Sequence, residues 1–262
     1  MGTPADPAPD IRALRAQRAS SFGAHAAAYA AHRPDYPEAG IRWALENIPE
    51  PTVLDLGAGT GKLTAGLLAV GAEVIAVEPD AEMRAELARR HPDVLSYAGT
   101  AESIPLEDGS VDAVVAGQAF HWFDQARAYP EIARVLRPGG VLAALWNEDD
   151  TTVEWVAGLQ QAARKAAVLP GVQILEKLER HPLFTGFETA SFAHTHRRSA
   201  ESLTATIGTY SHTLVVSARQ RAEVLDAVTD YLRGRPETAA GEFDFPIRTL
   251  VLRARLCGGA PG

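Results

Sequence analysis

Apolar and polar positions alternate along the first two thirds of the chain in a pattern typical of strands separated by helices. Runs rich in β-branched residues predict strands that begin at Thr52 and then lie at 73–78, 94–98, 111–116 and 141–146. The segments between them have helical composition, and further helices are expected at 11–31 and 41–48. This alternation predicts a parallel sheet covered by helices on both faces.

The pattern changes after Trp146. Residues 151–179 favour two helices broken at Leu169-Pro170-Gly171, and residues 200–234 are again helical in composition. Strands are expected at 187–197 and 243–256. We expect the helical pieces to form a cap over the carboxyl edge of the strands, which is where ligands bind in open α/β sheets.

The first predicted strand ends in a turn of strictly alternating glycines, Gly57, Gly59 and Gly61. Glycine suits a sharp strand-to-helix turn because it adopts positive φ and lets a ligand approach the backbone. The spacing differs from the G-x-G-x-x-G turn of dinucleotide enzymes and from the phosphate-binding P-loop. Asp55, two residues before the first glycine, would repel a pyrophosphate but attract an ammonium or sulfonium group.

A second acidic residue, Glu78, closes the next predicted strand twenty-one residues beyond Gly57. In a βαβ unit an acidic side chain at this place typically accepts hydrogen bonds from ribose hydroxyls. A nucleoside site beside a cationic site points to S-adenosylmethionine as the ligand.

These motifs resemble those of class I S-adenosylmethionine-dependent methyltransferases, whose signature is a D/E-x-G-x-G-x-G turn followed by an acidic residue that closes the second strand. Within the family, the small-molecule methyltransferases such as the trans-aconitate type are the most similar. The resemblance covers residues 20–146 well and continues through the segments 99–106, 111–115 and 131–140. It implies a doubly wound, Rossmann-like α/β sheet of seven strands, the last antiparallel, with helical cap insertions. The implied organisation is a helical lid at 1–38, a cofactor-binding core at 39–150, and cap insertions with the last two strands at 151–262.

The resemblance also implies a set of cofactor-binding residues. The turn would seat the methionyl part, Glu78 the ribose, Met83 and Ala101 the adenine, and an N-terminal segment would close over the cofactor, with Arg33 as a clamp for the methionyl carboxylate. The implied set comprises Tyr29, Arg33, Asp55, Gly57, Ala58, Gly59, Gly61, Glu78, Pro79, Met83, Thr100, Ala101, Glu102, Gln118 and Ala119. Thr100 departs from the family pattern, since many relatives carry Asp there and a hydroxyl accepts more weakly.

His121 lies in the segment after the fourth predicted strand, where the family places the reacting end of the site. Its imidazole can accept the proton that an attacking hydroxyl, acid or amine loses, which makes it the candidate catalytic residue. Two other interpretations stay open: contact with cofactor or substrate without proton transfer, and packing at the rim. Methyl transfer from a sulfonium can proceed by alignment and desolvation without a base.

The composition of the chain limits the kinds of partner and metal site that we expect. The formal net charge of -8 argues against a nucleic-acid partner. No membrane span or signal peptide is expected, which predicts a cytoplasmic protein. Cys257 is the single cysteine, and the pair His194 and His196 is interpreted as a polar sheet face, so no metal site is expected.

The sequence therefore predicts methyl transfer from S-adenosylmethionine to a small molecule, with O-methylation of a carboxyl or hydroxyl favoured over N- and C-methylation. The alternative is a cofactor-retaining binding protein or a non-methylating enzyme on the same scaffold, because a fold does not fix a function. A nicotinamide-dependent dehydrogenase is disfavoured by the glycine spacing. The substrate and the oligomeric state are left open.

Overall fold

The computed structural model describes residues 32–46, 48–166, 180–210, 213 and 216–258. The predicted helix at 11–31, the second of the two helices expected within 151–179, and most of the predicted lid at 1–38 lie outside these residues. Of the lid, only residues 32–38 fall within the described part of the chain.

Seven strands form one sheet in the order β3-β2-β1-β4-β5-β7-β6. The first five strands run parallel to one another, whereas β7 runs antiparallel to both β5 and β6. The predicted fold class, including the antiparallel last strand, is confirmed. The strands are β1 (Thr52–Leu56), β2 (Glu73–Val77), β3 (Leu95–Tyr97), β4 (Val111–Gly117), β5 (Leu136–Asp149), β6 (Glu188–Ser199) and β7 (Glu242–Arg255).

The helices begin where the sequence supplies an N-terminal signal. The helix expected at 41–48 begins earlier, directly after Pro37. In the described part of the stretch 200–234, α8 and α10 each start with a serine capping box, at Ser199 and Ser217. The helices are α3 (Glu38–Ala44), α4 (Lys62–Ala69), α5 (Ala81–Arg90), the short 3-10 helix η1 (Phe120–Trp122), α6 (Gln125–Val135), α7 (Glu154–Ala166), α8 (Ala200–Gly208) and α10 (Ala218–Arg233).

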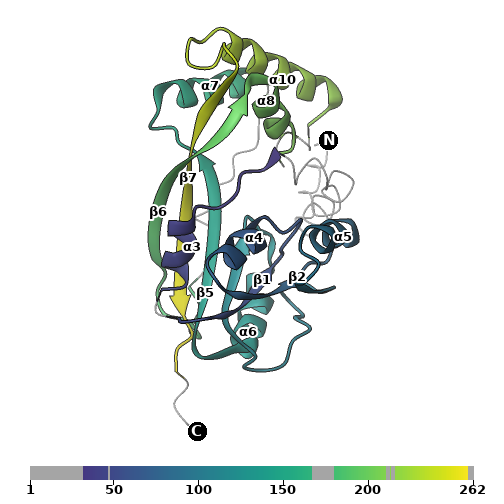
Figure 1. Ribbon diagram of the computed structural model, residues 1–262, viewed down its shortest axis with the longest axis vertical. Coiled ribbons are helices and arrows are strands. Elements are labelled where there is room, and N and C mark those ends of the chain that lie inside the picture. Colours follow the sequence, from purple (N-terminus) through teal and green to yellow (C-terminus); the bar gives the residue numbers. More distant parts are fainter. Residues whose placement is uncertain (1–31, 47, 167–179, 211–212, 214–215, 259–262) are drawn as a thin grey trace, which may run out of the picture.

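The strand β5 is longer than its predicted range of 141–146, and together with β6 and β7, which lie within one or two residues of their predicted ranges, it carries the cap. In Figure 1, β5, β6 and β7 continue upward past the parallel strands to the level of α7, α8 and α10. Phe243, Phe245 and Ile247 of β7 are buried against these helices, where they form one apolar cluster with Trp155, Leu203 and Val228. The cap therefore has its own core, built on the extended end of the sheet.

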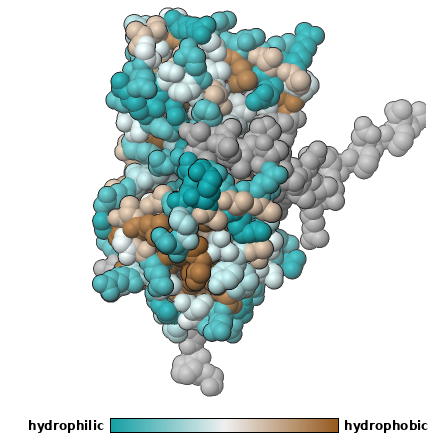
Figure 2. All heavy atoms as spheres, turned by 45° about the vertical axis from the view of Figure 1, so that its right-hand side comes forward, coloured by the Kyte–Doolittle hydropathy of each residue, from teal (hydrophilic) through white to brown (hydrophobic). Residues whose placement is uncertain are grey.

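Two further apolar clusters cover the two faces of the sheet, one including α6 and the other α3 and α4. The face drawn in Figure 2 is mainly hydrophilic over the cap, whereas apolar side chains gather on the lower half. The exposed large apolar side chains among the described residues all lie outside the cap helices: Leu68, Leu95, Tyr97 and Leu183. No helix within the described residues has the length and apolar character needed to cross a bilayer.

Candidate active site

The glycine turn joins β1 to α4 and has the conformation that its sequence predicts. Gly57, Gly59 and Gly61 have φ values of 71°, 56° and 84°, a region that other residues rarely adopt. A Cβ on Gly57 would lie 2.8 Å from the Cβ of Ala119, so this position also needs glycine for close packing against the end of β4. A Cβ on Gly59 would meet no atom within 4 Å, so the turn at this point faces open space that a ligand can fill.

Asp55 lies at the carboxyl end of β1 with 1% of its surface exposed. Its Oδ2 accepts a hydrogen bond from Oγ1 of Thr64 at 2.6 Å, whereas its buried Oδ1 has no hydrogen-bond partner. Burial raises the pKa of the Asp55 carboxyl to about 7, an effect that the Thr64 hydrogen bond opposes. A cationic donor beside Oδ1 would satisfy this oxygen and restore the charged form.

Glu78 follows β2 and holds the glycine turn directly. Its Oε2 accepts from the backbone N–H of Gly59 at 2.8 Å, and its Oε1 accepts from the N–H of Asp80 at 2.9 Å. Burial raises the pKa of Glu78, and the two backbone hydrogen bonds oppose the rise. The two acidic residues predicted from the sequence thus both lie next to the glycine turn. Asp55 precedes it at the end of β1, and Glu78 accepts a hydrogen bond from its backbone.

The residues assigned to the adenine lie beyond Glu78. Met83 is buried in the first turn of α5, whose N-terminus Asp80 caps, and Ala101 is buried, whereas Pro79 and Thr100 are exposed. The carboxylate of Glu102 accepts from the N–H of Asp124 at 2.7 Å, which ties it to the start of α6. The cofactor roles of these residues and of Ala58 stay predictions.

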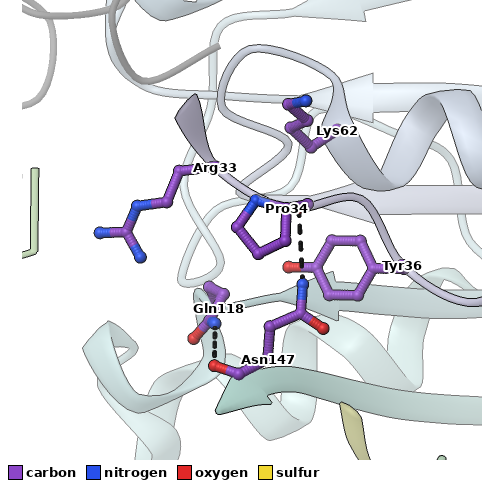
Figure 3. A pocket seen from close by; sticks show the side chains of 6 residues that line it. All are labelled: Arg33, Pro34, Tyr36, Lys62, Gln118 and Asn147. Carbon is purple, nitrogen blue, oxygen red and sulfur yellow. Dashed lines mark hydrogen bonds between the residues drawn. The ribbon is translucent and has the colours of Figure 1, made fainter. Parts of the chain in front are cut away.

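A small pocket opens at the carboxyl ends of β4 and β5, lined by Arg33, Pro34, Tyr36, Lys62, Gln118 and Asn147 (Figure 3). Gln118 has a positive φ of 56°, a conformation that is uncommon outside glycine and is often found at functional sites. Its Nε2 donates to the backbone oxygen of Asn147 at 2.8 Å, so Gln118 can offer Oε1 and its second amide N–H to a ligand. Together with Ala119, Gln118 stands where the sequence places the reacting end of the site.

The N-terminal segment, residues 33–36, lies along this pocket. It is hydrogen-bonded both to the strands of the core and to the cap. Asn147 Nδ2 donates to the backbone oxygen of Asp35 at 3.1 Å, and the Asp35 carboxylate pairs with Lys62 Nζ at 2.9 Å. Arg33, predicted to clamp the cofactor carboxylate, donates to the Thr209 carbonyl at 3.0 Å and stacks 4.6 Å from the Tyr210 ring centre. Arg33 thus lines the pocket while contacting the cap, and its clamp role stays a prediction; Tyr29 lies outside the described residues.

His121 lies in η1, directly after Gln118, Ala119 and Phe120. Its Nδ1 accepts a hydrogen bond from the indole Nε1 of the fully buried Trp146 at 3.1 Å, and its ring packs 4.6 Å from that of Trp122. An indole N–H can only donate, so Nδ1 carries no proton and a neutral His121 has its proton on Nε2. No local pattern along the chain indicates this contact, because its two residues lie 25 positions apart.

The residues present fit S-adenosylmethionine. The open face of Gly59 leaves room for a ligand against the backbone, and the unpartnered Oδ1 of Asp55 suits the ammonium of its methionyl part. Two kinds of contributor are absent from the predicted set. Thr64 and Trp146 bond to Asp55 and His121, and four further residues line the pocket: Pro34, Tyr36, Lys62 and Asn147. Lys62 and Thr64 follow the glycine turn within α4, so their nearness to it is the one signal that the sequence offered.

Comparisons with known proteins agree with this geometry. A family model described as a methyltransferase domain matches residues 54–144. An uncharacterized methyltransferase of Mycobacterium tuberculosis is 38% identical over 237 residues, which span 90% of this chain and 96% of that protein. A solved structure from Anaeromyxobacter dehalogenans, a candidate type II methyltransferase, aligns with a TM-score of 0.61 and 29% identity over 88% of this chain and 99% of its own.

A relative with a named reaction matches a smaller part of the chain. The malonyl-[acyl-carrier protein] O-methyltransferase of Methylococcus capsulatus is 40% identical over 135 residues, which span 47% of this chain and 48% of that protein. The full-length similarity, the sheet order and the glycine turn with its two acidic residues lead to one assignment. The chain belongs to the class I S-adenosylmethionine-dependent methyltransferases, and S-adenosylmethionine is its cofactor.

Proposed function

We propose that the protein methylates an oxygen atom of a small molecule, a carboxylate in preference to a hydroxyl. The observation that carries this proposal is the hydrogen bond from Trp146 to Nδ1 of His121. It assigns the proton of a neutral His121 to Nε2, so His121 donates a hydrogen bond to the acceptor and does not remove its proton.

The bound cofactor supplies a methyl group on a sulfonium, and an oxygen lone pair forms the new C–O bond as the C–S bond breaks and its electron pair goes to sulfur. The chain's own residues position the reactants. Asp55 and the glycine turn would hold the methionyl part, Glu78 the ribose hydroxyls, and Gln118 the reacting end. Because alignment and exclusion of water can supply most of the rate in such a displacement, no base is required of the protein.

An acceptor that needs no base is one that is already ionised. A carboxylic acid is ionised at neutral pH, whereas an ordinary alcohol is not. Nε2–H of His121 can donate to one carboxylate oxygen while the other attacks, which orients the acceptor without neutralising it. The O-methyltransferase activity named for the malonyl-[acyl-carrier protein] relative is compatible with methylation of an oxygen, and that similarity is confined to about half of the chain.

The test uses acids, alcohols and amines that share one carbon skeleton, for example 3-phenylpropionate, 3-phenylpropanol and 3-phenylpropylamine, each incubated with enzyme and methyl-labelled cofactor. We expect label to enter the acids, and we expect mild alkali to release it as methanol because esters hydrolyse where ethers and methylamines do not. Alkali-stable label on the alcohols or amines would overturn the carboxylate assignment. Cofactor binding without transfer to any member of the panel would favour the alternative of a binding protein or a non-methylating enzyme.

A further inference from the structure

Arg198, the penultimate residue of β6, is a buried cation with an incomplete set of partners. Its side chain has 8% of its surface exposed, and one terminal nitrogen donates to the backbone oxygen of His32. Its Nε is buried without a hydrogen-bond partner, and no carboxylate of the described residues forms an ion pair with it. A buried charge in this state is costly unless a ligand or counter-ion completes it.

Within the part of the chain that the structure describes, the surroundings of Arg198 do not supply that counter-ion. The carboxylate of Asp35 attracts Arg198 through space but is already paired with Lys62 at 2.9 Å. His196 lies on the same face of β6, and burial together with the Arg198 charge lowers its pKa to about 4, so it is neutral at physiological pH. Arg33 adds a second guanidinium, stacked 4.6 Å from the ring centre of Tyr210, whose hydroxyl feels the charge of Arg198. The Asp149 carboxylate accepts from that hydroxyl at 3.4 Å and attracts Arg33, but, like Asp35, it forms no ion pair with Arg198.

Arg198 also lies beside the methyl-transfer pocket. The His32 oxygen that it contacts also accepts from Thr206 of α8, and His32 directly precedes Arg33 and Pro34, which line the pocket. The guanidinium thus stands where the N-terminal segment, the end of β6 and the cap meet. Holding a backbone carbonyl needs only one neutral donor, so that contact alone leaves the buried charge of Arg198 unexplained.

We propose that Arg198 binds an anionic group of the methyl acceptor, a carboxylate or a phosphate, distinct from the oxygen that is methylated. This inference rests on the proposed function, since it assigns a second recognition point to the same acceptor. A guanidinium presents N–H groups in a fixed fork that matches the oxygens of either anion, and its unpartnered Nε lies on that fork. The favoured acceptor is then an acid with at least one further negative charge.

Neighbouring Arg197 provides a matched control. It points to the opposite face of β6, where its exposed guanidinium pairs with Glu242 and Asp244 at 3.4 Å each. The experiment is calorimetric titration of the full chain, saturated with S-adenosylhomocysteine, with malonate, inorganic phosphate and the uncharged malonamide. The variants are Arg198→Gln, Arg198→Lys and Arg197→Gln.

We expect the wild type to bind malonate or phosphate but not malonamide, and the Arg197→Gln variant to behave likewise. Arg198→Gln should weaken anion binding about tenfold or more, and Arg198→Lys should weaken it less while keeping the preference for anions. Unchanged affinity for S-adenosylhomocysteine shows that each variant is folded. A preference for phosphate over malonate would identify a phosphorylated acceptor, and the reverse an acceptor with a second carboxylate.

Equal anion affinity in Arg198→Gln and the wild type would overturn the inference, as would an equal loss in Arg197→Gln or a wild type that binds neither anion. Because binding is read without methyl transfer, the two proposals fail separately. Anion binding that depends on Arg198 in a protein that methylates no acid would remove the proposed function and leave the anion site. Methylation of acids with the same KM in the wild type and Arg198→Gln would support the proposed function and remove the anion site at Arg198.

Discussion

The indole N–H of Trp146 in β5 donates to Nδ1 of His121 in η1 across 3.1 Å. This hydrogen bond determines which ring nitrogen of the neutral imidazole carries the proton and can act as a donor. Trp146 is fully buried, so the bond is held in the core beneath the site. His121 and Trp146 can therefore be treated as one unit, in which the buried residue positions the one that we propose contacts the acceptor.

The first prediction concerns this pair. Trp146→Phe removes the indole donor, so we expect kcat for an acid acceptor to fall about tenfold, while the affinity for S-adenosylhomocysteine changes little. His121→Gln, which keeps an N–H donor, should retain more activity than His121→Ala, which has none. The control is Trp155→Phe in the cap core, which removes similar volume away from the site. If His121→Gln were as inactive as His121→Ala, the donor role would be wrong and a base would be favoured.

The second prediction concerns Asp55, whose pKa burial raises from 3.8 to about 7. At pH values between these two pKa values, Asp55 binds a proton in the folded protein but not in the unfolded chain. The contribution of Asp55 to the free energy of unfolding therefore falls as pH rises from about 4 to 7. A cationic ligand favours the ionised carboxylate, so the affinity for S-adenosylhomocysteine should rise over the upper part of this range and level off above it. Calorimetric titration between about pH 5.5 and pH 8.5 measures this.

Asp55→Asn is the matching variant, since it keeps the shape of the side chain and removes its titration. It should lose the pH dependence of both stability and binding, and bind S-adenosylhomocysteine about tenfold more weakly at about pH 8. It should be no less stable than the wild type at that pH, because the buried charge is gone. A wild-type affinity that does not vary with pH would show that Asp55 does not contact the ammonium.

The third prediction tests whether the glycine turn faces the cofactor. Gly59→Ala places a Cβ in open space at a φ of 56°, and Gly109→Ala does the same at a φ of 60° in the turn before β4. Both should lose about 1–2 kcal/mol of stability from the left-handed conformation, measured by urea unfolding. Only Gly59→Ala should also lose cofactor affinity, because only there would the added carbon occupy ligand space. Equal affinity in the two variants would place the cofactor elsewhere.

A feature of this fold could be predicted from the sequence when the residues that form it are close together along the chain. The turn from Gly57 to Gly61 and the acidic residue Glu78 could be identified, because the spacing of the glycines and the position of the acid after a strand are local patterns. Contacts between distant segments were not, as with Arg33, whose guanidinium meets Thr209 of the cap. The strand β5 exceeds its apolar run of 141–146, because its residues 147–149 pair with β7 in a contact between distant segments that no local pattern indicates. Arg197 and Arg198 look alike in sequence, and only the register of β6 separates an exposed residue from a buried one.

The last prediction concerns Asn147, which fastens the N-terminal segment to the sheet. Its Nδ2 donates to the Asp35 backbone oxygen, and its Oδ1 accepts from the hydroxyl of the fully buried Thr249. Because Thr249 uses its proton in that bond, it accepts from Nε2 of His194 at 2.8 Å, so the three side chains form one directed chain. The chain fixes which way the Asn147 amide faces, and therefore holds its N–H groups toward the segment.

Thr249→Val keeps the shape of the side chain and removes the hydroxyl, which takes away the hydrogen-bond partner of the half-buried His194 donor and of the half-buried Asn147 acceptor. We expect a loss of about 1–3 kcal/mol in the free energy of unfolding. Because the Asn147 amide is then free to turn, the segment over the pocket should loosen and the affinity for S-adenosylhomocysteine should fall several-fold. Thr229→Val, whose hydroxyl bonds within the cap to the Leu225 carbonyl, is the control and should leave that affinity unchanged. If Thr249→Val lost stability but bound the cofactor as the wild type does, the segment would not depend on this chain of hydrogen bonds for its place over the site.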